Sequence, residues 1–311
     1  MTRANRWFLY GPFALAALVL LGWFMMWRSG ADAMRRGLAE FSSQAALQGA
    51  VIAHQPLKAR GFPFYLRGVV ADFSATTRDR HYACSRLNLD ALAYAPDRLV
   101  LSCGGEQLIA SREKTWRLDA ADARASIARD KQRGWMIRAE TGAAAATSGE
   151  ERISVGAATI NVAPSAADPA TLQASLRLLA VEAVGLYAVE RFDAAASLQP
   201  ADSAGGRRLD IHGAELVVNG ATLKAQGSLA FAPGAAARGR LDAELQKPVG
   251  LARALVGARL LTADEAKAAE AGLALLAVAS GGIIRAPIEW EEGEVRLAGV
   301  RIARAPKPRQ P

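Results

Sequence analysis

The apolar and polar positions of this chain follow three successive patterns. From Trp7 to Trp27 the sequence is apolar and carries no charged residue. Over 28–48, apolar residues recur at spacings of three and four, the period of one helix face: Met34, Leu38, Phe41 and Ala45. Beyond residue 50 the period changes to two, as in strands with one buried face. The pattern predicts a long apolar helix, a helical stalk and a β-rich remainder.

The first segment is long enough to cross a membrane. At about 1.5 Å per residue, an uncharged helix over 7–27 covers a hydrocarbon core of about 30 Å. Aromatic residues mark both of its ends, as expected at membrane interfaces: Trp7, Tyr10, Trp23 and Trp27. A cleaved signal peptide is the alternative, because Ala31 and Ala33 form a small-x-small cleavage pattern, but its apolar region is usually about 7–15 residues. We expect an uncleaved anchor.

The charges that flank this segment are nearly balanced. Arg3 and Arg6 precede it, whereas Arg28, Arg35 and Arg36 follow it, so the positive-inside rule decides little. The short tail before the helix and the nature of the remaining chain favour a cytoplasmic N-terminus in the inner membrane. We expect the bulk of the chain to be periplasmic.

The region of period two contains many short candidate strands. Strands are expected within 63–75, 84–94, 97–103, 106–112, 115–128, 134–141, 153–163, 215–231, 238–246 and 283–302. Gly68 is expected to interrupt the first of them, 95–98 to form a turn, and 141–151 to form a loop. The clearest turn signal is Asn219-Gly220, which lies between two alternating apolar runs and predicts a hairpin.

One segment carries conflicting signals. Asp168-Pro169 is typical of a helix start, and the residues after it fit a helix face. The same segment also alternates with a period of two, in Leu172, Ala174, Leu176 and Leu178. We favour a strand.

Helices are expected again late in the chain. The segments 248–260 and 262–280 form a predicted helical pair, and Thr262 with Glu265 gives the second helix a capping box. A final hairpin is expected to turn near 292–293.

No alternation of strands and helices is present, which excludes doubly wound α/β folds. The expected fold is mainly β: a long antiparallel meander or half-open β-groove, with an N-terminal transmembrane helix and the late helical pair packed on the sheet. The expected parts are a cytoplasmic tail and anchor (1–30), a helical stalk (31–50), a β-rich periplasmic domain (51–302, in halves 51–140 and 152–302) and a disordered tail (303–311).

Composition and charge add two constraints. Hydrophobic residues make up 51% of the chain and aromatic residues only 6%, so Ala, Leu and Val must build the core. Lys and Arg outnumber Asp and Glu by 38 to 30. The basic residues are scattered among acidic ones, as in 124–130, and no nucleic-acid-binding module is recognisable. We expect no nucleic-acid partner.

The order of short motifs resembles a known family. RGFPF (60–64) leads into the first long strand, GATLKAQGSLAF (220–231) precedes the helical pair, and PIEW (287–290) with GEVRL (293–297) forms the final hairpin. This order resembles an alphaproteobacterial envelope family known as domain of unknown function 2125, over nearly the whole chain. That family looks like a short relative of the AsmA-like proteins, which are anchored in the inner membrane, project β-sheets into the periplasm and are implicated in moving or organising lipids. The resemblance supplies no catalytic residue.

Cys84 and Cys103 are the two cysteines of the chain. In an exported domain such a pair predicts one structural disulfide, and the alternative is two buried thiols in a cytosolic domain. A simple hairpin turning at Pro96 would place Cys103 near Asn88 rather than near Cys84. A wider loop or a bulge must therefore shift the register. The spacing is not C-x-x-C, so no redox role is expected.

The other candidate residues do not predict catalysis or metal binding. The three histidines, His54, His81 and His212, are far apart and have no cysteine or carboxylate at metal-ligand spacing. Serines lack a G-x-S-x-G setting, and Gly104-Gly105 fits a turn rather than a phosphate-binding loop. We expect neither an enzyme nor a bound cofactor or metal.

The apolar alternation carries the functional hypothesis. The hairpin over 214–231 places Leu216, Val218 and Leu223 on faces that either form core under the helical pair or line a groove for acyl chains. Such a groove would hold lipid by burying methylene groups, at about 0.8 kcal/mol each. We expect an anchored, non-enzymatic envelope protein that binds or handles lipid, with membrane lipid and a phospholipid ligand as partners. The alternative is a structural or scaffolding protein that tethers an envelope protein partner near the membrane.

Overall fold

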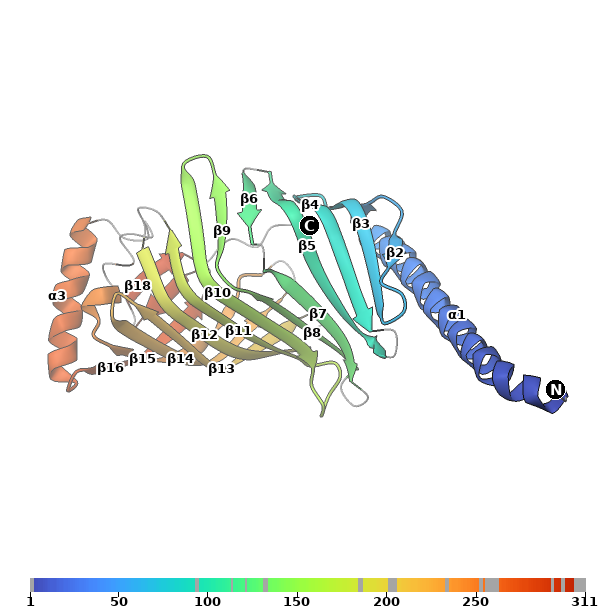
Figure 1. Cartoon of the computed structure of the whole chain (residues 1–311). Helices are drawn as coiled ribbons and strands as arrows, with labels where there is room; N and C mark the ends of the chain where they lie inside the picture. Colours follow the sequence, from blue (N-terminus) through green and yellow to red (C-terminus); the bar gives the residue numbers. More distant parts are fainter. Residues whose placement is uncertain are drawn as a thin grey trace. The chain divides into compact units, whose positions relative to one another are not determined.

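A computed structural model gives the fold of the chain (Figure 1) and describes residues 3–92, 95–112, 114–120, 122–130, 134–183, 187–200, 206–232, 235–251, 254, 263–291, 294–297 and 300–304. The protein is mainly β with antiparallel strand pairing, an N-terminal apolar helix and a late short helix, which confirms the predicted fold class. The chain divides into two compact units, Met1–Ala128 and Arg129–Pro311.

The first unit begins with one long helix, α1 (Arg3–Leu47), so the predicted anchor and stalk are continuous. Within the part of the chain that the structure describes, α1 is the one helix long and apolar enough to cross a membrane. Its first half exposes large apolar side chains such as Phe13 and Leu18, whereas Ala31 and Leu38 in its second half are buried. The helix therefore combines an uncovered apolar half with a half that packs on strands.

The strands of the first unit pair around β3. They are β1 (Val51–Ala53), β2 (Lys58–Arg60), β3 (Tyr65–Thr76), β4 (Arg80–Leu92), β5 (Ala95–Ser111), β6 (Thr115–Asp119) and β7 (Arg124–Asp130). β1 and β2 pair with opposite ends of β3, β4 lies between β3 and β5, and both β6 and β7 pair with β5. The core lies where α1 covers these strands, and it contains Leu38, Leu57, Val70, Phe73, Cys84 and Leu89.

Gly68 is not the strand irregularity that the sequence predicted. It pairs in register with Leu89, and the interruption falls at Asp72, which has a φ of 50° and is skipped in the pairing with β4. Gly68 is required for a different reason, because a Cβ atom there would lie 2.6 Å from Sδ of Met34. The glycine allows α1 to approach β3 closely.

Three segments predicted as turns or loops lie in strands instead. Gly104-Gly105, predicted as a turn, lies within β5 where its pairing with β4 is irregular. Residues 95–98 belong to β5. Leu92 pairs with Ala95 and Ala91 with Leu99, so the residues between Ala95 and Leu99 have no partner on β4. Pro96 is one of them, and its lack of an N–H group therefore costs no hydrogen bond to β4. The segment 141–151 contains β9 (Ala144–Ser148), which pairs with β10 (Glu151–Pro164). Backbone pairing outweighs the weak strand preference of alanine there.

The second unit is an antiparallel meander of strands, which we call the second sheet, together with one late helix (Figure 1). Besides β9 and β10 it contains β8 (Gly134–Thr141), β11 (Leu172–Ala183), β12 (Tyr187–Pro200), β13 (Arg207–Val218), β14 (Ala221–Phe231), β15 (Arg238–Gln246), α3 (Ala263–Ala279), β16 (Ile283–Glu291), β17 (Glu294–Leu297) and β18 (Val300–Arg304). β8 and β9 both pair with β10, and from β10 to β18 each strand pairs with the next.

The ambiguous segment after Asp168 is a strand, as predicted, and pairs along its length with β10 and β12. Asp168 begins no helix: its carboxylate accepts hydrogen bonds from the Ala170 N–H and the Thr171 hydroxyl and closes the turn before β11. The predicted Asn219-Gly220 hairpin is confirmed, and the two residues have φ values of 48° and 72° that this turn requires.

Helix α3 confirms the second member of the predicted helical pair. Most of the predicted helix 248–260, together with Thr262, lies outside the described residues, as do 292–293 and 305–311. The strands on either side of 292–293 pair as the predicted final hairpin. β18 includes Ala303 and Arg304, so the strand extends into the segment predicted as a tail.

Candidate functional site: two faces of the second sheet

The strands β10 to β16 send alternate side chains to opposite faces of their sheet. The register aligns these side chains into rows that cross the strands. The row that we call the charged row contains Thr159, Arg177, Asp193, Glu215, Lys224, Glu244 and Arg285. Beside it lies a row of mostly small polar residues, the polar row, which a bulge in β13 interrupts: Asn161, Ser175, Ala195, Gln226, Asp242 and Pro287.

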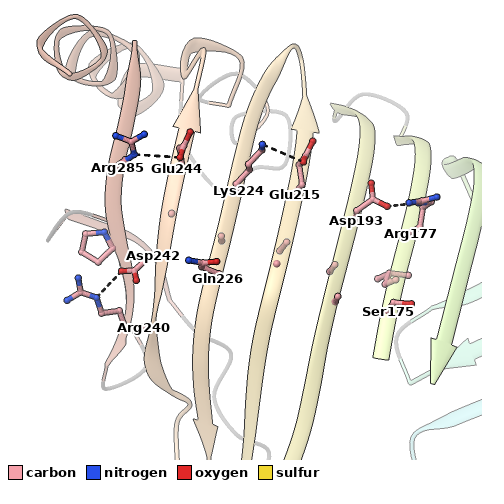
Figure 2. A pocket seen from close by; sticks show the side chains of 18 of the residues that line it. Ser175, Arg177, Asp193, Glu215, Lys224, Gln226, Arg240, Asp242, Glu244 and Arg285 are labelled. Carbon is pink, nitrogen blue, oxygen red and sulfur yellow. Dashed lines mark hydrogen bonds and ion pairs between the residues drawn. The ribbon is translucent and has the colours of Figure 1, made fainter. Parts of the chain in front are cut away.

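Oppositely charged neighbours in the charged row form cross-strand ion pairs, which Figure 2 shows from close by. The shortest distances are 2.6 Å for Arg177 to Asp193, 3.6 Å for Arg285 to Glu244 and 4.0 Å for Lys224 to Glu215. These pairs are largely exposed, so water screens them and they contribute little to stability. Opposite charges across neighbouring strands favour pairing, so these three ion pairs favour the observed register.

Two carboxylates of this row, Asp193 and Glu215, lie directly opposite each other across β12 and β13. Arg191 contacts both of them and offsets their repulsion. The hydrogen bond from Arg177 to Asp193 also raises the pKa of Arg177 above its usual value, so this guanidinium keeps its charge. The charged row is therefore largely neutralised within itself.

The charged and polar rows line an open hollow of about 1160 Å³ that extends from Arg138 on β8 to Arg285 on β16. Its lining also includes the residues between these two rows, Leu176, Ala194, Ala214, Ala225, Ala243 and Ala286. Arg177, Lys224 and Asp242 are among its walls (Figure 2). Charged groups lose hydration when hydrocarbon covers them, so this hollow suits water or polar groups and not an acyl chain.

The opposite face of the same strands is apolar. Its central row, the alanine row, contains Ile160, Leu176, Ala194, Ala214, Ala225, Ala243 and Ala286. One neighbouring row holds larger side chains, Leu178, Phe192, Leu216, Leu223, Leu245 and Ile284. The other contains Val162, Ala174, Ala196, Ile211, Gly227, Leu241 and Ile288. From β12 to β16 the side chains of the alanine row are single methyl groups. They project less far from the sheet than the side chains of the row that begins with Leu178.

The apolar face is buried at one end of the meander and partly open at the other. On β15 and β16, Leu241, Leu245 and Ile284 are buried, with exposed fractions of 6%, 2% and 7%. On β8 and β10, Ile137 and Ile160 expose 46% and 45% of their surface. Aliphatic side chains in the open half therefore remain available to an apolar ligand.

A family of bacterial proteins matches residues 27–306 and is described as an uncharacterized protein conserved in bacteria, DUF2125. The chain belongs to the DUF2125 family. The matched region covers most of both units, including the cysteines and every row of the second sheet, and begins at Trp27 within α1. No curated protein and no solved structure matches the chain.

In this DUF2125 member, the three residues predicted to line a groove all lie on the apolar face. Leu216 and Leu223 pair directly across the β13–β14 hairpin, and both are half-buried. Val218 pairs with Ala221 beside the turn and is only 2% exposed. None of the three lines the hollow, which belongs to the charged face.

The remaining sequence candidates lie apart from these faces or make only local contacts. Cys84 and Cys103 form a disulfide in the first unit. His54 lies beside the Gln55 carbonyl oxygen, His81 beside the Thr76 hydroxyl, and His212 beside the Ser197 hydroxyl. In the described parts of the chain, no group of three or more histidine, cysteine or acidic side chains is arranged to hold a metal ion.

The charged and alanine rows are features that sequence reasoning did not assign. A recurring triplet signals them, in which a mid-strand alanine has a charged residue on one side and a charged residue, a glutamine or a proline on the other. It occurs as Arg138-Ala139-Glu140, Lys224-Ala225-Gln226, Asp242-Ala243-Glu244 and Arg285-Ala286-Pro287. The alanine of each triplet aligns with the alanine row, and the two residues beside it lie on the charged face.

Proposed function

We propose that this protein is a single-pass inner-membrane protein with its bulk in the periplasm, and that the apolar face of its second sheet binds lipid acyl chains. The observation that carries the proposal is the open half of that face, where Ile137 and Ile160 stay nearly half exposed beside rows without a charged side chain. The proposed role is to hold or hand on lipid and is not enzymatic.

The anchor is supported by the exposed half of α1. Phe13, Leu18 and Val19 expose 73%, 66% and 63% of their surface. Keeping such a side chain in water rather than in an apolar environment costs about 1.5–3 kcal/mol. A bilayer removes that cost along the whole apolar stretch.

Retention of the anchor is supported by contacts made by residues before the candidate cleavage site, which follows Ala33. Trp23 and Trp27 donate indole hydrogen bonds to backbone carbonyl groups of the first unit, and Ala31 is buried against it. Cleavage after Ala33 would remove all three contacts. The folded unit therefore includes residues that a signal peptidase would remove.

Orientation is supported by the disulfide, because such bonds persist in oxidising compartments such as the periplasm. The test is alkaline phosphatase fused after Arg35 or at the C-terminus. We expect both fusions to be active, since the enzyme folds only outside the cytoplasm. Two inactive fusions that are stably expressed would reverse the proposed topology.

Hydrocarbon fits the apolar face better than a peptide does. The named positions of the alanine row and its neighbours offer no side-chain donor or acceptor, whereas a bound peptide backbone needs partners for its polar groups. From β8 to β13, away from the buried end of the face, the alanine row crosses about 19 Å of sheet, at about 4.8 Å between strands. One leaflet of a hydrocarbon core is about 15 Å deep. The row is thus long enough for an acyl chain laid across the strands.

Two adjacent alanines give a matched test of this site. Ala194 lies in the alanine row, whereas Ala195 lies on the charged face of the same strand. The full-length protein is purified in a detergent that preserves bound lipid, extracted with organic solvent and analysed for phospholipid by mass spectrometry. We expect co-purified phospholipid in the wild type and in Ala195→Leu, and a loss of at least half in Ala194→Leu, because the larger side chain fills the alanine row.

All three proteins are compared by thermal unfolding, so that loss of lipid is scored only for a folded variant. Equal lipid content in folded Ala194→Leu and wild type would exclude the alanine row as the site. Wild-type protein without lipid would favour the second candidate function, a tether for an envelope protein partner.

The tether is favoured by one observation, the broad charged face with its hollow. It ranks second because the principal charges there already pair with each other, as in Arg177 with Asp193 and Arg285 with Glu244. A partner would have to displace these pairs or bind around them.

A further inference from the structure

A tight turn from Gly61 to Tyr65 is attached directly to the end of the apolar half of α1. The indole N–H of Trp23 donates to the Pro63 carbonyl oxygen at 2.6 Å, and that of Trp27 donates to the Tyr65 carbonyl oxygen at 2.8 Å. The tryptophans are one helical turn apart and thus face the same side. The turn is held against the helix at two points.

The turn is closed within itself as well. The Tyr65 N–H donates to the Gly61 carbonyl oxygen at 2.9 Å. Gly61 has a φ of 98°, and a Cβ atom there would lie 2.8 Å from the Tyr65 carbonyl oxygen. Only glycine fits this position without distorting the turn. The turn therefore has a defined shape as well as a defined attachment.

The aromatic side chains of this turn contact α1 only in part and remain partly exposed to solvent. The Phe62 ring meets Phe24 and Trp27 edge to face, at centroid distances of 5.6 and 5.9 Å. Even so, Phe62, Phe64 and Tyr65 expose 44%, 66% and 61% of their surface. Such a cluster of exposed rings beside a membrane-length helix marks a surface that binds an apolar or interfacial partner.

The depth of the turn follows from its attachment. Trp23 and Trp27 end the uncharged stretch of α1, where aromatic residues occupy the boundary between hydrocarbon and headgroups. Two exposed arginines, Arg28 on α1 and Arg60 before the turn, flank the rings. Rings at the boundary with cations just outside match the order of hydrocarbon, interface and phosphate in a bilayer.

We propose that the Gly61–Tyr65 turn is a second membrane-contacting element, with Phe62, Phe64 and Tyr65 immersed in the periplasmic interface of the membrane that α1 spans. The inference rests on the proposed anchor and is independent of lipid binding by the second sheet. β3 begins at Tyr65, so this contact places the first residue of β3 at the membrane. It thereby fixes the direction in which the first unit extends from the membrane.

The test measures the depth of one side chain in the full-length protein. Phe64→Cys, with the Cys84–Cys103 disulfide intact, is labelled with an environment-sensitive fluorophore and reconstituted into vesicles of phosphatidylethanolamine and phosphatidylglycerol. Phe64 is suitable because it is the most exposed ring of the turn. The matched control is Arg78→Cys, which lies beyond the far end of β3, about 40 Å away along the strand.

We expect blue-shifted emission at position 64 and at least twofold quenching by lipids with a nitroxide near the headgroup, with little quenching at position 78. Extraction of the same vesicles with carbonate tests separately whether the protein is anchored, because an anchored protein stays in the membrane. Water-like emission without quenching at position 64, in protein that resists extraction, would overturn the proposed membrane contact and leave the anchor standing. Extraction of the protein by carbonate would instead overturn the anchor, and the membrane contact with it.

Discussion

Cys84 and Cys103 are joined by a disulfide although neither residue lies opposite the other across β4 and β5. Cys103 faces Leu87 and Cys84 faces Gln107. A bulge between Cys84 and Arg86 shifts the register and brings the two Cα atoms to 6.0 Å. Gly105, with a φ of 90°, supplies the backbone conformation that the bulged segment needs. Cys84 is also among the most buried residues of the first unit, so the bond lies within its core.

Removal of this disulfide should lower the stability of the first unit. The cysteines are separated by 19 residues, and a loop of this size contributes about 3 kcal/mol in the chain-entropy model. We expect that loss in Cys84→Ser/Cys103→Ser, measured by denaturant unfolding in detergent. Reductant should destabilise the wild type and leave the double variant unchanged. Free alkylation of both cysteines in native protein isolated from the envelope would show that the bond does not form in the cell.

The close approach of α1 to β3 should make Gly68 intolerant of larger side chains. In Gly68→Val, the added atoms meet Sδ of Met34 and the methyl groups of Leu57. Overpacking of this kind costs about 1–3 kcal/mol. We expect Met34→Ala to recover part of the loss, because it removes the nearest obstructing atom. A double-mutant cycle measures this coupling, and strictly additive effects would contradict the contact.

A charge on the apolar face should be far more harmful than a charge on the opposite face of the same strand. Leu223 packs against the core that contains Leu229 and Leu241. We expect Leu223→Asp to destabilise the second unit by about 3 kcal/mol or more, because the carboxylate loses water without gaining a partner. Ser228→Asp is the control, since Ser228 lies on the charged face between Asp210 and Arg240, where the new carboxylate stays hydrated. Similar unfolding midpoints for the two variants would refute the assignment of the faces.

The turn before β11 should weaken in acid. Hydrogen bonds from the Thr171 hydroxyl and the Ala170 N–H lower the pKa of Asp168. A depressed pKa in the folded state gives stability that is present above the unfolded value, about 3.9, and is lost as the pH falls through the folded value. The difference in unfolding midpoint between wild type and Asp168→Ala should therefore be present at neutral pH and shrink below about pH 4. A difference that grows in acid would contradict this assignment.

Several elements could be predicted because their signals are local. The uncharged run over 7–27, the two-residue turn at Asn219-Gly220 and the alternation in β11 each depend on neighbouring residues and on the period of one element. Predictions failed where pairing with a neighbouring strand, rather than the residue pattern of the segment itself, decides the structure. Residues 95–98 and 144–148 are strands because β4, β7 and β10 supply hydrogen-bond partners for them.

The candidate site shows the same division. The triplets around Ala225, Ala243 and Ala286 are visible in the sequence, but nothing local aligns one triplet with another. Only the pairing of successive strands places these alanines in one row and the ion pairs in another. A shift by one residue would move every side chain to the other face, so the register decides whether either row exists.

The sequence by itself determined the apolar helix, the mainly β character and the two-residue turn, because side-chain periodicity and turn chemistry act over a few residues. The tertiary structure alone decided that Gly68 serves the approach of Met34, that a bulge unites Cys84 with Cys103, and that the turn after Arg60 rests on Trp23 and Trp27. Each of these depends on contacts between segments far apart in the chain. Their geometry is set by packing of the whole unit, which no local pattern encodes.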